Sequence, residues 1–144
     1  MSRSYKWSRP LPRRSGVRNA GDIERVLTAF ARESNGGLIV TPSPLTATRR
    51  DLIIAAAARL SLPAIYSFRF YANSGGLVSY GINQLELVRE AASYVDRILR
   101  GANPGELPVQ LPTKYEFVIN LKTAKALGLT IPQSVLARAD EVIQ

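Results

Sequence analysis

The sequence predicts an α/β fold in which a parallel β-sheet is flanked by helices. Short, continuously apolar runs are typical of strands buried in such a sheet, and segments with helical periodicity alternate with them. Clusters of glycine and proline separate the two kinds of segment. Alternation of this kind indicates parallel strands joined by right-handed crossovers. The length of 144 residues suits one domain.

The first half of the chain predicts two helices and two strands. A helix begins near Asn19, a possible N-cap, and ends before the glycines at 36–37; its apolar residues recur at helical spacing: Ile23, Val26, Leu27 and Phe30. The run 38–40 is expected to be a strand buried on both faces. A second helix is predicted over about 47–60, and a second strand over 64–66.

The second half predicts a loop over 67–75, a strand over 76–81 and then the longest helix, 82–99. That helix carries an apolar stripe expected to be buried: Leu85, Val88, Ala91, Ala92, Val95, Ile98 and Leu99. An extended connector contains Pro108 and Pro112. It leads to the remaining predicted elements, which are a strand over 115–120 and helices over 122–127 and 132–143.

The composition argues against catalysis. The chain has no cysteine and no histidine, which removes most zinc sites, most nucleophile–base systems and the commonest general base. No dinucleotide or phosphate loop matches, and no carboxylate pair stands out by its spacing. We therefore expect a protein that is not an enzyme, with no cofactor and no metal. The longest apolar run is too short to span a bilayer.

The net charge of +8 is concentrated at the N-terminus. Residues 1–18 hold six basic side chains and no acidic one, so residues 19–144 carry 13 basic and 11 acidic side chains, a net charge of +2. We interpret 1–18 as a disordered basic tail and 19–144 as the folded domain. The tail predicts loose, salt-sensitive binding to polyanions and no specific nucleic acid. It also lacks the apolar core of a secretory signal.

Ligands of open parallel sheets bind beyond the carboxyl ends of the strands. Behind the second predicted strand, four aromatic residues and Arg69 fall within positions 66–71. Aromatic faces and a guanidinium suit a planar or apolar ligand that carries a carboxylate. An equally weighted interpretation is that the aromatic side chains cap the core and Arg69 reaches solvent.

Hydroxyl residues follow the first predicted strand at Thr41, Ser43 and Thr46. They could present hydroxyls and helix N-terminal amides to an anionic group. Helix capping by Ser and Thr would give the same pattern and is the favoured interpretation of these residues.

From about Val17 onward, the chain resembles the tryptophan/tyrosine-type family of ABC transporter substrate-binding proteins. The resemblance is carried by GGLIVTPSPLT (36–46), by LPAIYSFRFYANSGGLVSYG (62–81) and by the long stretch 91–143, in which YVDRILRG, LPVQLPTKYEFVINLKTAKALGL and ARADEVI are the most specific phrases. It implies a periplasmic-binding-protein-like fold, of which this chain would form one lobe and the hinge-side elements.

The resemblance also implies a function: a small amino-acid-like solute is bound without chemistry and delivered to an ABC permease. The cleft-facing candidates are Ser43, Tyr66, Arg69 and Tyr80. A truncated C-terminal part of such a protein is expected, with self-association through apolar surfaces left uncovered. The family implies a periplasmic or membrane-associated location, whereas the chain as given, without an export signal, would be cytoplasmic. The alternative is a basic-tailed nucleic-acid-binding or interaction protein built on a remnant lobe.

Overall fold

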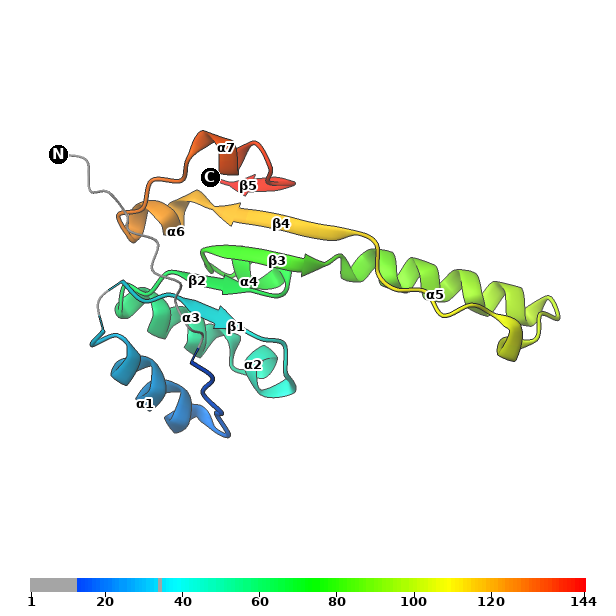
Figure 1. Cartoon of the computed structure of the whole chain (residues 1–144), viewed down its shortest axis with the longest axis horizontal. Helices are drawn as coiled ribbons and strands as arrows, with labels where there is room; N and C mark the ends of the chain where they lie inside the picture. The colour runs from blue at the N-terminus through cyan, green and yellow to red at the C-terminus, as the bar shows by residue number, and fades with distance from the viewer. Residues whose placement is uncertain (1–12, 34) are drawn as a thin grey trace.

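A computed structural model describes residues 13–33 and 35–144 of the chain. Five strands form one sheet, in the order in which they occur along the chain (Figure 1). They are β1 (Leu38–Val40), β2 (Ala64–Tyr66), β3 (Val78–Ile82), β4 (Tyr115–Asn120) and β5 (Glu141–Ile143). Helices flank the sheet, so the predicted α/β fold class is confirmed.

The helices of the described part supply most of the core. They are α1 (Ala20–Phe30), α2 (Pro44–Thr48), α3 (Arg50–Arg59), α4 (Arg69–Asn73), α5 (Gln84–Leu99), α6 (Leu121–Ala126) and α7 (Gln133–Leu136), with a 3-10 turn at Pro104–Glu106. Side chains from α1, α3, α4 and β2 form one buried cluster: Ile23, Leu27, Ile53, Ile54, Ala56, Ala57, Ala64, Tyr66 and Tyr71.

The sheet is mixed, which corrects the prediction of a parallel sheet. Strands β1, β2 and β3 run parallel, and so do β4 and β5, but β3 and β4 are antiparallel. The cause is the route of the chain. Helix α5 leads away from the end of β3, and the connector 100–114 returns beside it, so the chain enters β4 at the end where it left β3 (Figure 1). At the base of this excursion, the N–H of Asn83 donates to the carbonyl of Lys114 at 3.0 Å.

Three predicted segments differ from the structure. The single helix expected over about 47–60 is divided into α2 and α3. The expected loop 67–75 contains the five-residue helix α4, which is too short to show periodicity. The expected helix over 132–143 is replaced by α7 and β5. Val142 and Ile143 are β-branched and pair with the end of β4, so sheet pairing outweighs the helical pattern. Asp140 fixes the start of β5, because its carboxylate accepts a hydrogen bond from the N–H of Phe117 at 2.7 Å.

The expectation that both faces of β1 are buried was wrong. Leu38 and Val40 pack against the core cluster, whereas Ile39, which points to the opposite face, is 75% exposed. β1 is also an edge strand of the sheet. The apolar stripe of α5 was likewise expected to be buried, and no residue of α5 is. Among the described residues, no helix has the length and apolar character that a membrane crossing requires.

The domain boundary near residue 18 stays a prediction. Residues 1–12 of the predicted basic tail lie outside the described part. Of the rest, Val17 is partly buried and packs against the core cluster, and the guanidinium of Arg13 donates to the carboxylate of Glu33 at 2.6 Å.

Burial of Tyr66 predicts a loss of stability at high pH. The Tyr66 side chain is 2% exposed, and burial raises its pKa from 10.0 to about 12, with a smaller contribution from Tyr71. The unfolded chain loses this proton first, so the stabilisation is complete below pH 10.0 and is lost as pH rises to about 12. Two pKa units correspond to about 2.7 kcal/mol.

Denaturant unfolding over this pH range measures the effect. The control is Tyr66→Phe, which keeps the ring and removes the ionising hydroxyl. We expect the free energy of unfolding to fall by about 2 kcal/mol more in the original chain than in the variant. Equal slopes in both proteins would contradict the prediction.

Candidate ligand-binding edge of the sheet

The carboxyl ends of β1, β2 and β3 meet at one edge of the sheet, and a helix follows each of them. α2 begins with a capping box: the Ser43 hydroxyl accepts a hydrogen bond from the N–H of Thr46 at 3.1 Å, and the Thr46 hydroxyl accepts one from the N–H of Ser43 at 3.0 Å. α5 begins at Asn83, whose side-chain oxygen accepts from the N–H groups of Leu85 and Glu86. This capping explains why the second helix starts at Pro44 rather than near 47.

Backbones approach very closely at this edge. The Ser67 hydroxyl donates to the carbonyl of Val40 at 3.2 Å and ties the end of β2 to the end of β1. On its other side, β2 leads past Gly81 of β3. A Cβ built on Gly81 would lie 1.8 Å from the carbonyl oxygen of Ser67. Glycine is therefore required at position 81 by space and not by an unusual backbone angle.

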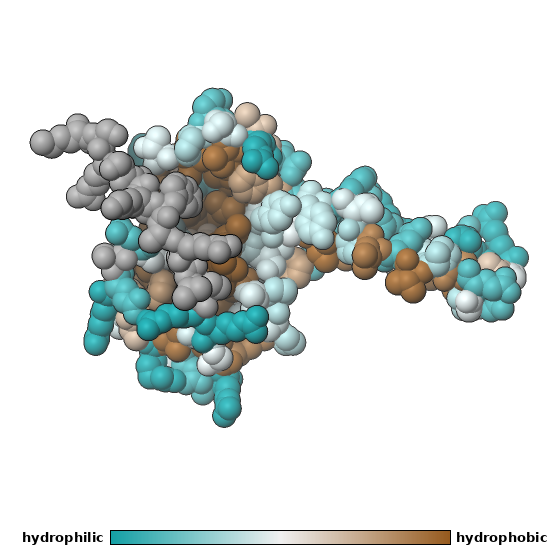
Figure 2. Space-filling model, viewed as in Figure 1, coloured by the Kyte–Doolittle hydropathy of each residue, from teal (hydrophilic) through white to brown (hydrophobic). Residues whose placement is uncertain are grey.

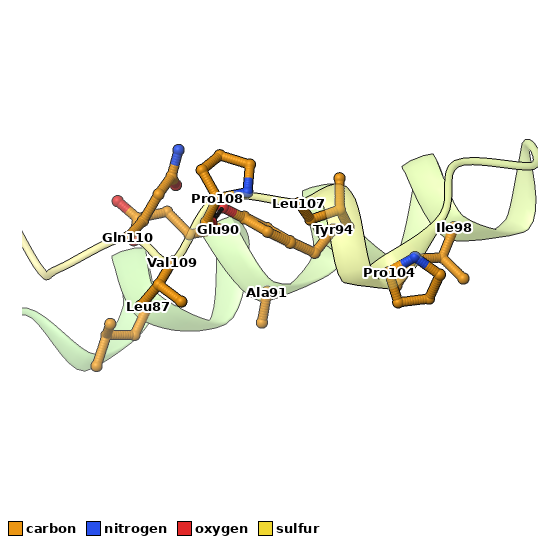
Figure 3. A pocket seen from close by; sticks show the side chains of 10 residues that line it. All are labelled: Leu87, Glu90, Ala91, Tyr94, Ile98, Pro104, Leu107, Pro108, Val109 and Gln110. Atoms are coloured by element: carbon orange, nitrogen blue, oxygen red, sulfur yellow. Dashed lines mark hydrogen bonds between the residues drawn. The ribbon is translucent and has the colours of Figure 1, made fainter.

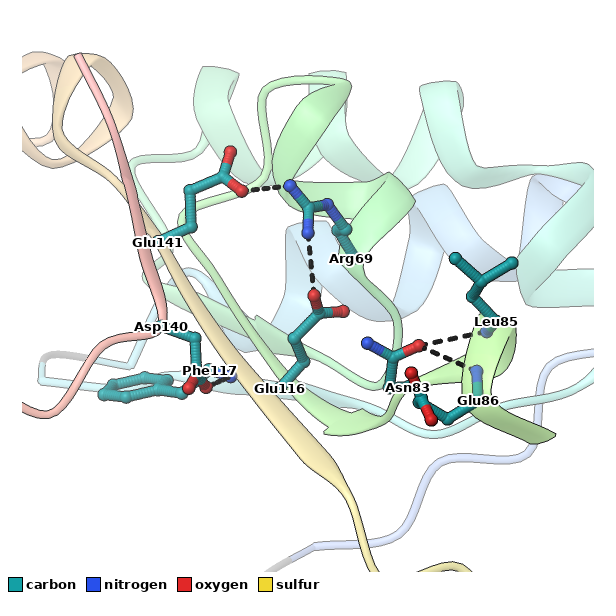
Figure 4. A network of polar contacts seen from close by, with 8 residues as sticks. All are labelled: Arg69, Asn83, Leu85, Glu86, Glu116, Phe117, Asp140 and Glu141. Carbon is teal, nitrogen blue, oxygen red and sulfur yellow. Dashed lines mark hydrogen bonds and ion pairs between the residues drawn. The ribbon is translucent and has the colours of Figure 1, made fainter. Parts of the chain in front are cut away.

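Arg69 lies at this edge between two carboxylates. Its guanidinium donates to Glu116 at 2.7 Å and to Glu141, from the starts of β4 and β5 (Figure 4). The hydrogen bond with Glu116 raises the pKa of Arg69, and the charge of Glu141 adds to this effect. Because two carboxylates face one guanidinium, the cluster carries a net charge of −1. It offers donors for an anion and acceptors for a cation within one small group.

Sequence reasoning did not find Glu116 and Glu141. Both are 40% exposed or less at the side chain, and both lie on the same face of the sheet as Val118. A signal existed for Glu116, because a charged residue two positions before buried Val118 interrupts an apolar face. For Glu141 no signal existed, since its segment was expected to be helical.

The structure brings only some of the predicted site residues to the edge. Ser43 and Arg69 lie there with exposed polar atoms. Tyr66 is buried in the core, where its ring stacks on Tyr71 with centroids 4.8 Å apart. Tyr80 is 55% exposed and stacks on Tyr115, but it lies on the opposite face of the sheet from Tyr66, because Tyr66 pairs with Ser79.

A groove of about 350 Å³ lies elsewhere, between α5 and the returning connector (Figure 3). Its walls are mainly apolar, including Leu87, Tyr94 and Ile98 from α5 and Leu107 to Val109 from the connector. The Tyr94 hydroxyl donates to the carbonyl of Pro108. None of the four predicted site residues lines this groove. Within 13–33 and 35–144, no group of three or more metal-ligating side chains is gathered that could hold an ion.

A parallel β–α arrangement with polar residues beyond the strand ends defines a class: α/β proteins that bind a small ligand at the edge of a sheet. Comparison of the chain with known proteins narrows this class. Residues 14–143 match the family model described as ABC transporter substrate binding protein. This match covers most of the chain, and the chain therefore belongs to that family. No curated protein matches the chain.

Solved structures agree with the family assignment. A conserved domain protein from Vibrio cholerae is 31% identical, with a TM-score of 0.74 over 85% of this chain and 41% of its own. An ABC domain in complex with L-Trp from Streptococcus pneumoniae is 28% identical, with a TM-score of 0.78 over 88% of this chain and 43% of its own. A ligand-free, open substrate-binding protein with adhesive properties from Clostridium difficile shares the fold at 19% identity and a TM-score of 0.64, over 90% of this chain and 43% of its own. The chain thus spans about two-fifths of the length of these structures.

Proposed function

We propose that this chain supplies one wall of a substrate-binding site that holds a small amino-acid-like solute and releases it unchanged. The observation that carries the proposal is the position of the Arg69–Glu116–Glu141 cluster at the carboxyl-end edge of the sheet, in a chain that belongs to a substrate-binding family. Similarity to a relative solved in complex with L-Trp favours an amino acid as the solute.

The charges of the cluster suit a zwitterion. An α-carboxylate can accept hydrogen bonds from Arg69, while an α-ammonium can donate to Glu116 or Glu141. The exposed ring of Tyr80 lies at the same end of the sheet but on the face opposite to Glu116, so it is not part of the cluster. Ser43 contributes a hydroxyl close to the end of β1. Buried Tyr66 packs in the core beneath this edge of the sheet.

Nothing in this arrangement calls for bond making or breaking. The family implies that the solute passes to an ABC permease, and that the protein acts outside the cytoplasmic membrane. Both statements belong to the proposal, because the chain spans less than half of the related structures.

The proposal predicts weak binding of L-Trp that maps to the sheet edge. High affinity requires a ligand to be enclosed on most sides, and the described edge is open. We therefore expect a dissociation constant of about 1 mM, or roughly 4 kcal/mol. Backbone amide shifts in NMR spectra should change saturably in segments 41–46, 67–69 and 80–83 during an L-Trp titration.

Two variants sharpen this measurement. Arg69→Gln should weaken binding by about five-fold, because an exposed charged contact contributes on the order of 1 kcal/mol. Arg25→Gln is the matched control: it removes an exposed arginine of α1 that pairs with Asp22 and should leave binding unchanged. Shifts confined to the groove between α5 and the connector would contradict the proposal, as would an unchanged titration of the Arg69 variant.

A further inference from the structure

Asn35 lies in the turn that joins α1 to β1, and a glycine follows it. Asn35 is exposed and has a φ of 62°, in the left-handed region that asparagine tolerates better than most residues. The turn lies at the amino end of β1, which is the end of the strand away from the candidate site (Figure 1). It follows a helix whose outward side carries mainly hydrophilic side chains (Figure 2), so water reaches this part of the described chain.

The backbone of this turn is held at its two ends. Before it, the N–H of Glu33 donates to the carbonyl of Phe30 at 3.0 Å, and after it, the N–H of Leu38 donates to the carbonyl of Pro63 at 2.8 Å. Between these two bonds, the N–H groups of 35–37 donate to no residue that the structure describes. Gly36 also has no side chain that would cover its own nitrogen. The amide nitrogen that follows the asparagine is therefore open to reaction.

We propose that Asn35 is a site of spontaneous deamidation, at which the folded chain converts asparagine to aspartate and isoaspartate. This inference does not depend on the proposed solute site. Asparagine side chains are among the thermally labile groups of proteins.

The reaction consumes water and releases ammonia. The amide nitrogen of Gly36 loses its proton and attacks Cγ of Asn35. The new N–Cγ bond closes a cyclic imide, while the Cγ–Nδ2 bond breaks and the leaving nitrogen takes up the proton as ammonia. Water then opens the ring. Attack of water at Cγ restores the normal main chain and gives aspartate, whereas attack at the backbone carbonyl carbon gives isoaspartate, whose main chain runs through Cβ and Cγ.

The other five asparagines of the chain are held against this reaction. Four of them cap helices, with a side-chain oxygen that accepts a hydrogen bond from a backbone N–H: Asn19, Asn83, Asn103 and Asn120. Asn103 is also followed by proline, which has no N–H and cannot attack. The fifth is Asn73 of α4, and the N–H of the next residue, Ser74, already donates to the carbonyl of Phe70 at 3.1 Å. The elimination leaves the asparagine of the α1–β1 turn.

The two products fit the turn differently. Aspartate tolerates the left-handed region as asparagine does, so this product keeps the turn and lowers the net charge of the chain from +8 to +7. Isoaspartate lengthens the main chain of the turn, where space is short: a Cβ built on Gly36 would lie 2.6 Å from Cζ of Phe30. The isoaspartyl form should therefore displace the Phe30 ring and lower the midpoint of thermal unfolding by about 3 °C.

Mass spectrometry tests the proposal on the full chain, incubated in water labelled with heavy oxygen and then digested in ordinary water. Trypsin releases 33–49, whose only asparagine is Asn35, and 70–89, which contains Asn73 and Asn83. Peptide 33–49 should exchange ammonia for one heavy oxygen atom at least about ten-fold faster than peptide 70–89. Its product should contain isoaspartate, which direct hydrolysis of the side-chain amide does not form. The rate should rise with pH, because the attacking nitrogen must lose its proton.

Two controls separate the effect of the fold from that of the local sequence. Asn35→Gln keeps a neutral amide but moves it one carbon farther from the Gly36 nitrogen, so peptide 33–49 should stay unchanged. A synthetic peptide 33–49 gives the rate without the fold. The folded chain should react within about ten-fold of this peptide, because the turn opens at little cost in free energy. Stronger protection by the fold, a product without isoaspartate, or equally fast conversion of peptide 70–89 would overturn the proposal.

Discussion

Replacing Gly81 by alanine is expected to destabilise the domain by about 3 kcal/mol, near the upper end for a single methyl group added to a packed site. The added Cβ would lie 1.8 Å from the carbonyl oxygen and 2.9 Å from the carbonyl carbon of Ser67. Both atoms are backbone, so no side-chain rotation relieves the clash. The ends of β2 and β3 would have to separate, and the hydrogen bond from Ser67 to Val40 would be strained with them.

Thermal unfolding measures this effect, and we expect the midpoint to fall by about 10 °C. The matched control is Ser79→Ala in the same strand. The Ser79 hydroxyl is buried and has no hydrogen-bond partner among the residues that the structure describes. Removing it should therefore leave the midpoint unchanged or raise it slightly. If Gly81→Ala unfolds at the same temperature as the control, the close approach of β2 and β3 is wrong.

The fold class could be predicted because local pattern and packing agree over most of the chain. The runs 38–40 and 64–66 are apolar and short, and 115–120 is mostly apolar. They became β1, β2 and the six-residue β4 with the predicted bounds. The direction of β4 could not be predicted in this way. It depends on where the connector 100–114 returns to the sheet, and no local pattern encodes that route.

Two short elements could not be predicted from the sequence for a related reason. Helix α4 has five residues and β5 has three, so neither is long enough for a period to stand out from its neighbours. Each is held by tertiary contacts instead. The side-chain amide of buried Asn120 donates to the carbonyl of Ala72 at 3.0 Å and fixes the end of α4 against β4.

The position of the candidate site was expected from topology, whereas its composition was not. Ligand sites at strand ends are a property of parallel sheets, and this placed Ser43 and Arg69 at the edge. The partners of Arg69 lie 47 and 72 positions away along the chain. A contact over such distances depends on the register of β4 and β5, so it became visible only with the sheet. Ser43 and Thr46 cap each other as the favoured interpretation had it.

The aromatic run 66–71 was the point at which sequence reasoning left two interpretations equal, and burial now separates its members. Tyr66 and Tyr71 are 2% and 1% exposed, whereas Arg69 between them reaches the edge. Tyr66 in β2 and Tyr71 in α4 both face the same core cluster, which is why they are buried and Arg69 is not. We therefore assign Tyr66 and Tyr71 to stability.

Replacing Tyr71 by alanine is expected to cost about 4 kcal/mol of unfolding free energy, because truncating a buried aromatic residue removes its packing and leaves a cavity. The Tyr71 ring stacks on Tyr66 and on Phe70, with centroids 4.8 and 4.6 Å away. The loss therefore affects the contact of α4 with β2 as well as the core. Urea unfolding monitored by circular dichroism measures the difference in free energy.

Tyr71→Phe is the control that distinguishes packing from hydrogen bonding. It keeps both stacked contacts and should retain most of the stability, within about 1.5 kcal/mol of the original. A phenylalanine variant as unstable as the alanine variant would show that the hydroxyl, and not the ring, holds α4 in place. An alanine variant that unfolds like the original chain would return the aromatic run to the ligand-binding interpretation, because a ring that contributes nothing to the core is free to serve a solute.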